Sequence, residues 1–229
     1  VGMYAYNFHS PPPGIRVHAN VIVSVATAFI KGGYTLDELI TGWAEMGARL
    51  GIREYYSVHT WDRDLPGRAR GSNLEYLTRT IPEFHRKGAR FLSAESSDNW
   101  GPNGLGYYLA ARMLWDVDEA GRIDELVEDF LLRAFGPAKD PMAEFYRLIV
   151  GSKPHLVFDD QLVRMFRSLQ KARKSSGSPA VKWSCVCPTW RTSSGKRGPP
   201  SSAIRHHSCY PVVERCRRMS CFFYTPSGP

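Results

Sequence analysis

The stretch Val21-Ile-Val-Ser-Val-Ala-Thr27 decides the fold, because its continuous β-branched character predicts a strand covered on both faces, as in a parallel sheet. Thr35-Leu-Asp-Glu38 follows with the spacing of a capping box. Apolar residues then recur at helical spacing as far as Leu50, which predicts a helix. Glu54-Tyr-Tyr-Ser-Val58 reads as a second strand, so this region predicts a strand–helix–strand unit.

Strands and helices continue to alternate on both sides of this unit. Upstream, aromatic residues alternate with smaller ones and predict a strand over residues 4–8. Downstream we expect a helix over residues 73–87, in which Pro82 should disturb the hydrogen bonding, and a strand over residues 90–94. Further helices are expected at 104–116, 122–135, 139–150 and 159–174.

This order predicts an α/β protein built from right-handed parallel units. A closed eight-stranded barrel takes roughly 250 residues, and the predicted strands are about half of such a barrel. We therefore predict the C-terminal half of a (β/α)8 TIM-like barrel at 1–120, a helical extension at 121–174 and an irregular tail at 175–229. Because the sequence starts on a strand-like segment without a methionine, we expect the full-length protein to supply an N-terminal barrel half or upstream domain.

The net charge of +8 is concentrated in the tail. Residues 1–174 carry 22 of the 30 basic and 21 of the 22 acidic side chains. Because this body is almost neutral, we expect no nucleic-acid partner. Residues 175–229 hold all five cysteines and show no helical or strand period. We interpret the tail as the product of a reading-frame shift in the gene, and a natural disordered basic tail is the alternative.

The sequence predicts no cofactor, no metal and no membrane segment. The pairs Cys185-x-Cys187 and Cys216-x₄-Cys221 miss the usual zinc-ligand spacings. The glycines of residues 101–106 match neither the dinucleotide fingerprint nor the P-loop. No apolar run approaches the ~20 residues of a membrane-spanning helix, and the chain shows no signal peptide. The sequence does not identify the cellular compartment.

Two loops that follow predicted strands carry the residues suited to a sugar site. Functional groups of parallel barrels lie on such loops, and sugar sites combine aromatic rings with carboxylates, amides and imidazoles. Glycoside hydrolysis also requires two carboxylates. Glu95 and Asp62 are the candidate catalytic residues, with their roles unassigned. The candidate substrate-binding residues are His59, Trp61, Arg63, Asp98, Asn99 and Trp100.

Each candidate also has a structural interpretation. Glu95 and Asp62 could cap the following helix or pair with an arginine, for which Arg63 and Arg112 are available. Trp100 could pack in the core, and the imidazole of the first loop could be a hydrogen-bonded structural group. A run of apolar residues further on is better explained as the buried face of a helix than as a ligand site: Tyr107, Tyr108, Leu109, Met113, Leu114 and Trp115.

The segment Ala94–Asp116, with Tyr107-Tyr-Leu-Ala-Ala-Arg-Met-Leu-Trp-Asp116 as its most specific part, resembles the bacterial domain-of-unknown-function family 4838 (DUF4838). The similarity continues through Asp124–Phe130 and Phe135-Gly-Pro-Ala138 and covers about residues 1–174. The resemblance implies a glycoside-hydrolase-like barrel that acts on or binds a polysaccharide or oligosaccharide, often beside an α-glucuronidase-like N-terminal domain. A non-catalytic carbohydrate-binding or scaffold domain is the alternative. No catalytic residue is carried over from the family.

Overall fold

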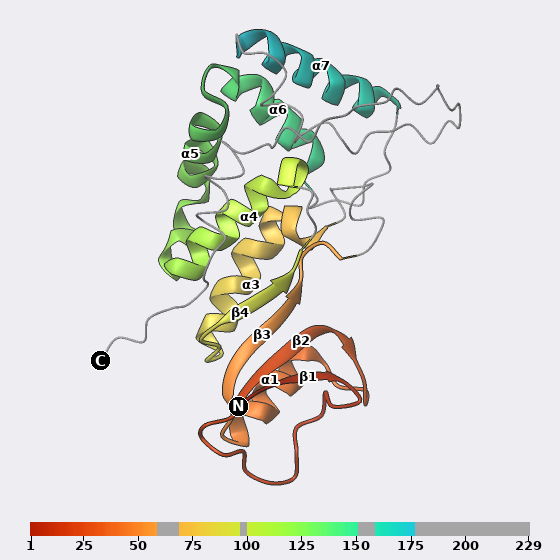
Figure 1. Cartoon of the computed structure of the whole chain (residues 1–229), viewed down its shortest axis with the longest axis vertical. Coiled ribbons are helices and arrows are strands. Elements are labelled where there is room, and N and C mark those ends of the chain that lie inside the picture. The colour runs from red at the N-terminus through yellow and green to blue at the C-terminus, as the bar shows by residue number, and fades with distance from the viewer. Residues whose placement is uncertain (59–68, 97–99, 151–158, 177–229) are drawn as a thin grey trace, which may run out of the picture.

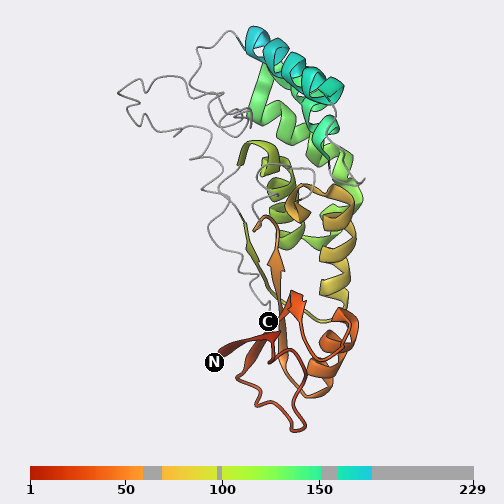
Figure 2. The ribbon, with the colours of Figure 1, turned by 90° about the vertical axis from the view of Figure 1, so that its right-hand side faces the viewer.

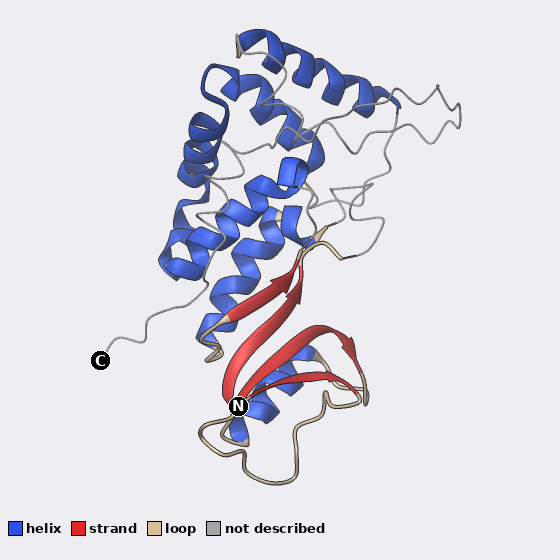
Figure 3. Cartoon of the chain, in the orientation of Figure 1, coloured by secondary structure: helices blue, strands red, loops and turns tan. Residues whose placement is uncertain are grey.

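The structure is a computed structural model that describes residues 1–58, 69–96, 100–150 and 159–176 (Figure 1). The elements of the first part are β1 (Gly2–Asn7), β2 (Ile22–Ile30), α1 (Leu36–Glu45), β3 (Arg49–Tyr55), η2 (Arg70–Ser72), α3 (Leu74–Arg86) and β4 (Leu92–Glu95). The second part contains α4 (Trp100–Trp115), η3 (Val117–Arg122), α5 (Ile123–Phe135), η4 (Gly136–Ala138), α6 (Lys139–Ile149) and α7 (Asp159–Ser175). Figure 3 shows the strands gathered at one end and the later helices extending from the other.

The four strands form one parallel sheet in the sequential order β1-β2-β3-β4. Val23 of β2 lies opposite Leu50 of β3, and Ile52 of β3 lies opposite Leu92 of β4. This arrangement confirms the α/β class and the parallel sheet predicted from the strand–helix alternation.

The two faces of the sheet differ in character. Figure 2 shows α1 and α3 on the same side of the sheet. The strand residues on that side form the core, and they are Ala5, Val23, Val25, Leu50, Ile52 and Leu92, each at most 6% exposed. The side chains that alternate with them point to the opposite face, which we call the open face. The open face carries polar and aromatic side chains, among them Tyr4, Arg53 and Glu95.

Helix α1 starts where the capping box predicts. Thr35 Oγ1 accepts a 3.2 Å hydrogen bond from the Glu38 amide, and Glu38 Oε2 accepts one of 2.7 Å from the Thr35 amide. The expected helix end near Leu50 is wrong, because the chain reverses at Gly47, whose φ is +85°. Leu50 therefore belongs to β3, which spans Arg49–Tyr55. The strand expected over residues 54–58 thus starts five residues earlier and ends three residues earlier than predicted.

Helix α3 runs through Pro82 without interruption. Asn73 caps its first turn by accepting a 3.0 Å hydrogen bond from the Tyr76 amide. A proline removes one intrahelical hydrogen bond, and here the loss is offset by burial of Leu77, Ile81 and Phe84 in the core. The expected helix is thus correct, and the disturbance at Pro82 does not break it.

The later helices occupy the segments that the sequence predicts. Helices α4, α5 and α6 meet around Phe130 and Tyr146, whose ring centroids are 5.7 Å apart. The expectation that Trp115 lies on a buried helix face is wrong, because Trp115 ends α4 and is 72% exposed. In the part of the chain that the structure describes, no helix combines the length and apolar character needed to cross a membrane.

Candidate functional site

An ion pair on the open face joins the inner strand β3 to its neighbour β4, which is an outer strand of the described sheet. Arg53 Nη2 contacts Glu95 Oε1, and Arg53 Nη1 donates a 3.5 Å hydrogen bond to Ser93 Oγ. The register explains the contact, since Arg53 lies opposite Ser93 and Tyr55 lies opposite Glu95. The Glu95 side chain is 42% exposed, against 21% for Arg53. A carboxylate at the carboxyl end of a strand is therefore held in place and still reachable from solvent.

Tyrosine rings surround this ion pair. The Arg53 guanidinium carbon lies 5.5 Å from the centroid of the Tyr4 ring and 5.9 Å from that of the Tyr55 ring. Strand β2 lies between β1 and β3, and its open-face residues Ser24 and Ala26 have small side chains. They leave room for the Arg53 side chain to extend across β2 toward Tyr4 on β1. Burial raises the pKa of Tyr55, and the nearby Tyr6 and Glu95 add to the shift. The Tyr55 phenol therefore keeps its proton to a higher pH than an exposed tyrosine does.

A second polar group lies on the helix-covered side of the sheet, where sequence reasoning expected only a strand. Glu54 is buried, with a side chain only 1% exposed. Its Oε1 accepts a 2.6 Å hydrogen bond from the Tyr76 hydroxyl, and its Oε2 lies 3.4 Å from Arg70 Nη1. Arg70 Nη1 also donates to Thr27 Oγ1 at 2.9 Å. A buried carboxylate is thus satisfied by residues of η2 and α3.

This buried group connects the carboxyl ends of the strands to the elements beside them. Arg70 belongs to η2, and the next amide, that of Gly71, donates a 2.9 Å hydrogen bond to the carbonyl of Tyr56. Burial raises the pKa of Tyr76, and the Glu54 carboxylate adds to the shift. The sequence did contain a signal for this buried group. Glu54 is a charged residue two positions after Ile52 in β3, so alternation places it on the core face, where a charged residue is unusual.

The structure brings only part of the predicted site into view. His59, Trp61, Asp62, Arg63, Asp98 and Asn99 lie outside the described residues. Glu95 pairs with Arg53, whereas Arg112, one of the two arginines expected as partners, contacts Glu119; the other, Arg63, lies outside the described residues. Trp100 starts α4, is partly buried, and packs edge-on against Tyr107 with ring centroids 4.9 Å apart.

The described residues offer no obvious metal site. Across residues 1–58, 69–96, 100–150 and 159–176, no three His, Cys, Asp or Glu side chains are grouped so that they could hold a metal ion. A shallow depression between α6 and α7 is apolar, which makes it unsuited to the chemistry predicted from the loops, and its lining residues are Phe145, Leu162, Met165, Phe166 and Leu169. The open face, with its Arg53–Glu95 ion pair beside the rings of Tyr4 and Tyr55, is the candidate site.

A protein-family model described as "Domain of unknown function (DUF4838)" matches residues 1–147. No curated protein and no solved structure matches the chain.

Proposed function

The chain belongs to the DUF4838 family, and from that premise we propose that it is a glycoside-hydrolase-like protein that acts on or binds a polysaccharide or oligosaccharide at the open face of its sheet. The observation that carries this proposal is the Arg53–Glu95 ion pair among the tyrosine rings of Tyr4 and Tyr55. A sugar presents apolar C–H faces that pack on aromatic rings and hydroxyls that bond to charged groups. The open face provides both kinds of partner within one cluster.

Glu95 is the proposed catalytic carboxylate. It sits at the end of β4, where parallel α/β folds place their functional groups. Its contact with the Arg53 guanidinium suits a role that needs the anion, namely nucleophile or base, better than a role that needs a bound proton. The second carboxylate that hydrolysis requires is assigned, as a proposal, to Asp62, which lies outside the described residues.

A carbohydrate-binding or scaffold domain without turnover is the second candidate. One observation favours it: Glu54, the other carboxylate near the end of β3, is buried on the face opposite Glu95 and is already bonded to Tyr76 and Arg70. Glu54 cannot serve as the partner of Glu95 across a bound sugar. Of the glutamates at the carboxyl ends of β3 and β4, therefore, only Glu95 faces the proposed site.

We also propose that the sheet is the C-terminal half of a (β/α)8 barrel whose N-terminal half belongs to the full-length protein. The support is the sequential parallel strand order together with α1 and α3 on the same side of the sheet (Figure 2). Strands wound in one direction with their helices outside curl toward a closed barrel. The open face would then line the barrel interior, and the Arg53–Glu95 pair would lie near its carboxyl-end mouth.

Hydrolysis assays on the chain and on the variant Glu95→Gln test the proposal. A panel of 4-nitrophenyl glycosides and soluble polysaccharides provides the substrates. Loss of a group in general acid–base or nucleophilic catalysis lowers kcat by about 10²–10⁴-fold, so we expect E95Q to fall at least about 100-fold. The matched control is Glu45→Gln, because Glu45 is an exposed carboxylate at the end of α1.

The outcomes separate the two candidates. Turnover by the chain that E95Q abolishes and E45Q retains supports the enzyme. Binding of oligosaccharide without turnover, weakened by Arg53→Met, supports the binding domain. Full turnover by E95Q removes Glu95 from the catalytic machinery.

A further inference from the structure

Arg53 holds the Glu95 carboxylate through one of its two oxygens only. Nη2 of Arg53 contacts Oε1 of Glu95, whereas Nη1 donates to Ser93 Oγ at 3.5 Å. Arginine often binds a carboxylate through two parallel hydrogen bonds, and here the second bond goes to the serine instead. In the part of the chain that the structure describes, no hydrogen bond or ion pair involves Oε2 of Glu95. One carboxylate oxygen is therefore fixed, and the other is available to a ligand.

The guanidinium group of Arg53 in turn contacts two aromatic rings. Its carbon lies 5.5 Å from the ring centroid of Tyr4 on β1 and 5.9 Å from that of Tyr55 on β3. Both distances fall within the range of about 6 Å in which an aromatic face attracts a cation. Because the two rings belong to different strands, they fix the direction in which the long arginine side chain crosses β2.

This arrangement is poorly explained as a source of stability. The Glu95 side chain is 42% exposed, and ion pairs open to solvent add little to the free energy of folding. Ordering a long arginine side chain also costs conformational entropy. Side chains from three strands thus hold one carboxylate in a defined place without a matching gain in stability. A group that binds or reacts with a ligand requires such support.

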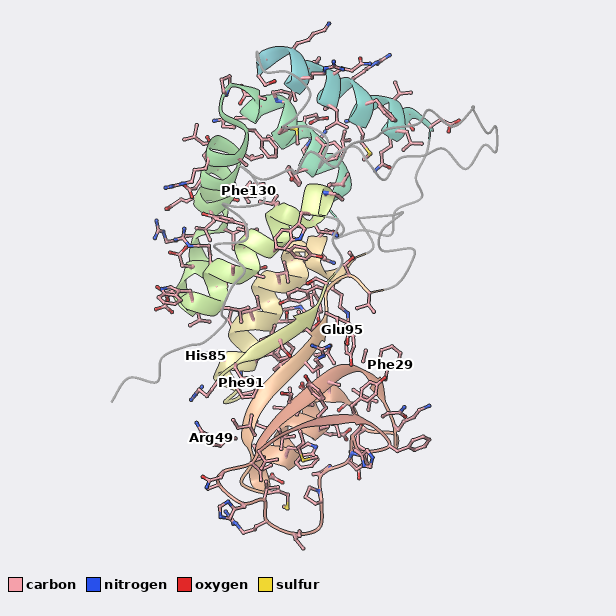
Figure 4. The ribbon with its side chains drawn as sticks, in the orientation of Figure 1. Phe29, Arg49, His85, Phe91, Glu95 and Phe130 are labelled. Carbon is pink, nitrogen blue, oxygen red and sulfur yellow. The ribbon has the colours of Figure 1, made fainter. Side chains whose placement is uncertain are left out.

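The carboxylate lies at the position where the proposed site needs it. Glu95 is the last residue of β4, and Figure 4 labels it near the carboxyl end of that strand. A displacement of a reacting group by about 1 Å can lower a rate about 100-fold. An exposed glutamate side chain without a partner would rotate among several rotamers. The position of the carboxylate therefore depends on its contact with Arg53.

We propose that Arg53 is the positioning residue of the site, which holds Oε1 of Glu95 and thereby presents Oε2 to the bound sugar. The inference rests on the proposed function and adds to it a residue and the oxygen atom that meets the substrate. Arg53 acts through Glu95 and not as a direct ligand, since Nη1 and Nη2 are already bonded to Ser93 and Glu95.

Chemical rescue of the variant Arg53→Ala tests the proposal. The unchanged chain, R53A and E95Q are assayed on the panel of glycosides and polysaccharides, with low-millimolar guanidinium chloride or with sodium chloride at the same concentration. We expect kcat of R53A to fall about 100-fold with a much smaller change in KM, because the carboxylate loses its position. Guanidinium can replace the missing group beside the two rings, so it should restore part of the kcat of R53A and none of that of E95Q.

Two further variants separate position from charge and from general effects of losing an arginine. Arg53→Lys keeps the charge as a compact ammonium group without the planar guanidinium, so its kcat should lie between those of R53A and the unchanged chain. Arg147→Ala is the matched control, because Arg147 on α6 forms an exposed ion pair with Glu144, and its kcat should not change. Circular dichroism checks that each variant is folded.

The outcomes distinguish this inference from the proposed function. If E95Q loses turnover while R53A keeps it, Arg53 is not the positioning residue, and Glu95 remains the proposed catalytic carboxylate. A loss in R53A that guanidinium does not relieve also overturns the inference. If the unchanged chain turns over none of the substrates, the inference fails together with the enzymatic proposal. Should R53A be unfolded, R53K and Arg53→Gln are compared with the unchanged chain. Equal kcat in all three overturns positioning, and a fall from arginine through lysine to glutamine supports it.

Discussion

The hydroxyl of Tyr76 donates a 2.6 Å hydrogen bond to Oε1 of Glu54, and this bond attaches α3 to the carboxyl end of β3. The Glu54 side chain is 1% exposed, so it depends on protein partners for every hydrogen bond it makes. Its second oxygen accepts from the Tyr55 amide at 3.0 Å and faces Arg70 at 3.4 Å. Removing any one partner leaves a buried negative charge less well satisfied.

The variant Tyr76→Phe should lower the free energy of unfolding by about 1.5–3 kcal/mol, the usual worth of a hydrogen bond to a charged group. Urea denaturation followed by circular dichroism measures the change. Tyr34→Phe is the control, because Tyr34 is 40% exposed and its hydroxyl is accessible to water. Equal stability of Y76F and Y34F would mean that the Glu54 carboxylate finds a replacement partner.

The contact between η2 and α4 depends on two glycines. A Cβ at Gly106 would lie 1.7 Å from the backbone carbonyl oxygen of Gly71, and neither atom can move away by a side-chain rotation. Overpacking costs about 1–3 kcal/mol, so Gly106→Ala should destabilise the chain by about 3 kcal/mol. Gly104→Ala in the same helix meets nothing nearer than Phe130 Cζ at 3.8 Å. That control should gain up to about 1 kcal/mol from helix propensity, and a matching loss in both variants would contradict the close approach.

Local signals in the sequence predicted most of the elements. The capping box at Thr35 defined the start of α1, and continuous β-branched residues defined β2 as an inner strand. The end of α1 was misplaced because Leu50 continues the helical spacing by coincidence. Gly47 itself was the available signal, since a glycine in the left-handed conformation commonly ends a helix.

The site was harder to predict because it depends on contacts between strands. Glu95 was predicted as a site residue from its position after a strand, but its ion-pair partner Arg53 is 42 residues away in the chain and becomes a neighbour only through the register of β3 and β4. Glu54 was read as part of a strand, without a partner. Phe29 falls just beyond the strand that the sequence predicted, and its ring packs against Tyr6 and Tyr55 where the register between β1 and β2 becomes irregular, which periodicity does not predict.

Tyr55 should make stability depend on pH in the alkaline range. Burial, with Tyr6 and Glu95, raises the pKa of Tyr55 above its ordinary value of 10.0. The folded chain therefore retains the phenol proton at a pH where the unfolded chain has released it. Stability from this group is present below pH 10 and is lost as pH rises through the folded pKa. Urea denaturation at pH 9 and pH 11 should show a smaller loss for Tyr55→Phe than for the unchanged chain.

The variant Glu95→Gln tests whether the Glu95 charge contributes to the raised pKa of Tyr55. Removing the Glu95 charge takes away one of the contributions that raise the pKa of Tyr55, so the alkaline loss should be smaller in E95Q as well. An unchanged pH profile in Y55F would show that other tyrosines account for the whole effect.

The outer strands of the sheet should cause association. In the part of the chain that the structure describes, β1 and β4 each have one strand neighbour only, which leaves backbone groups on the other edge free to pair with another chain. If the sheet is half of a barrel, as proposed, this edge pairing belongs to the missing half. We therefore expect the chain alone to self-associate or to require a partner, and sedimentation velocity over a range of concentrations measures this.

A charged substitution on an outer strand distinguishes association by strand pairing from nonspecific association. Met3 lies on β1 and is 38% exposed, and a lysine there should oppose strand pairing, so Met3→Lys should shift the chain toward the monomer. Thr41→Lys adds the same charge at an exposed position of α1 and should leave association unchanged. Equal effects of the two lysines would indicate a response to net charge alone. A monodisperse monomer that melts cooperatively without a partner would contradict the half-barrel, because such a sheet would already satisfy its own edges.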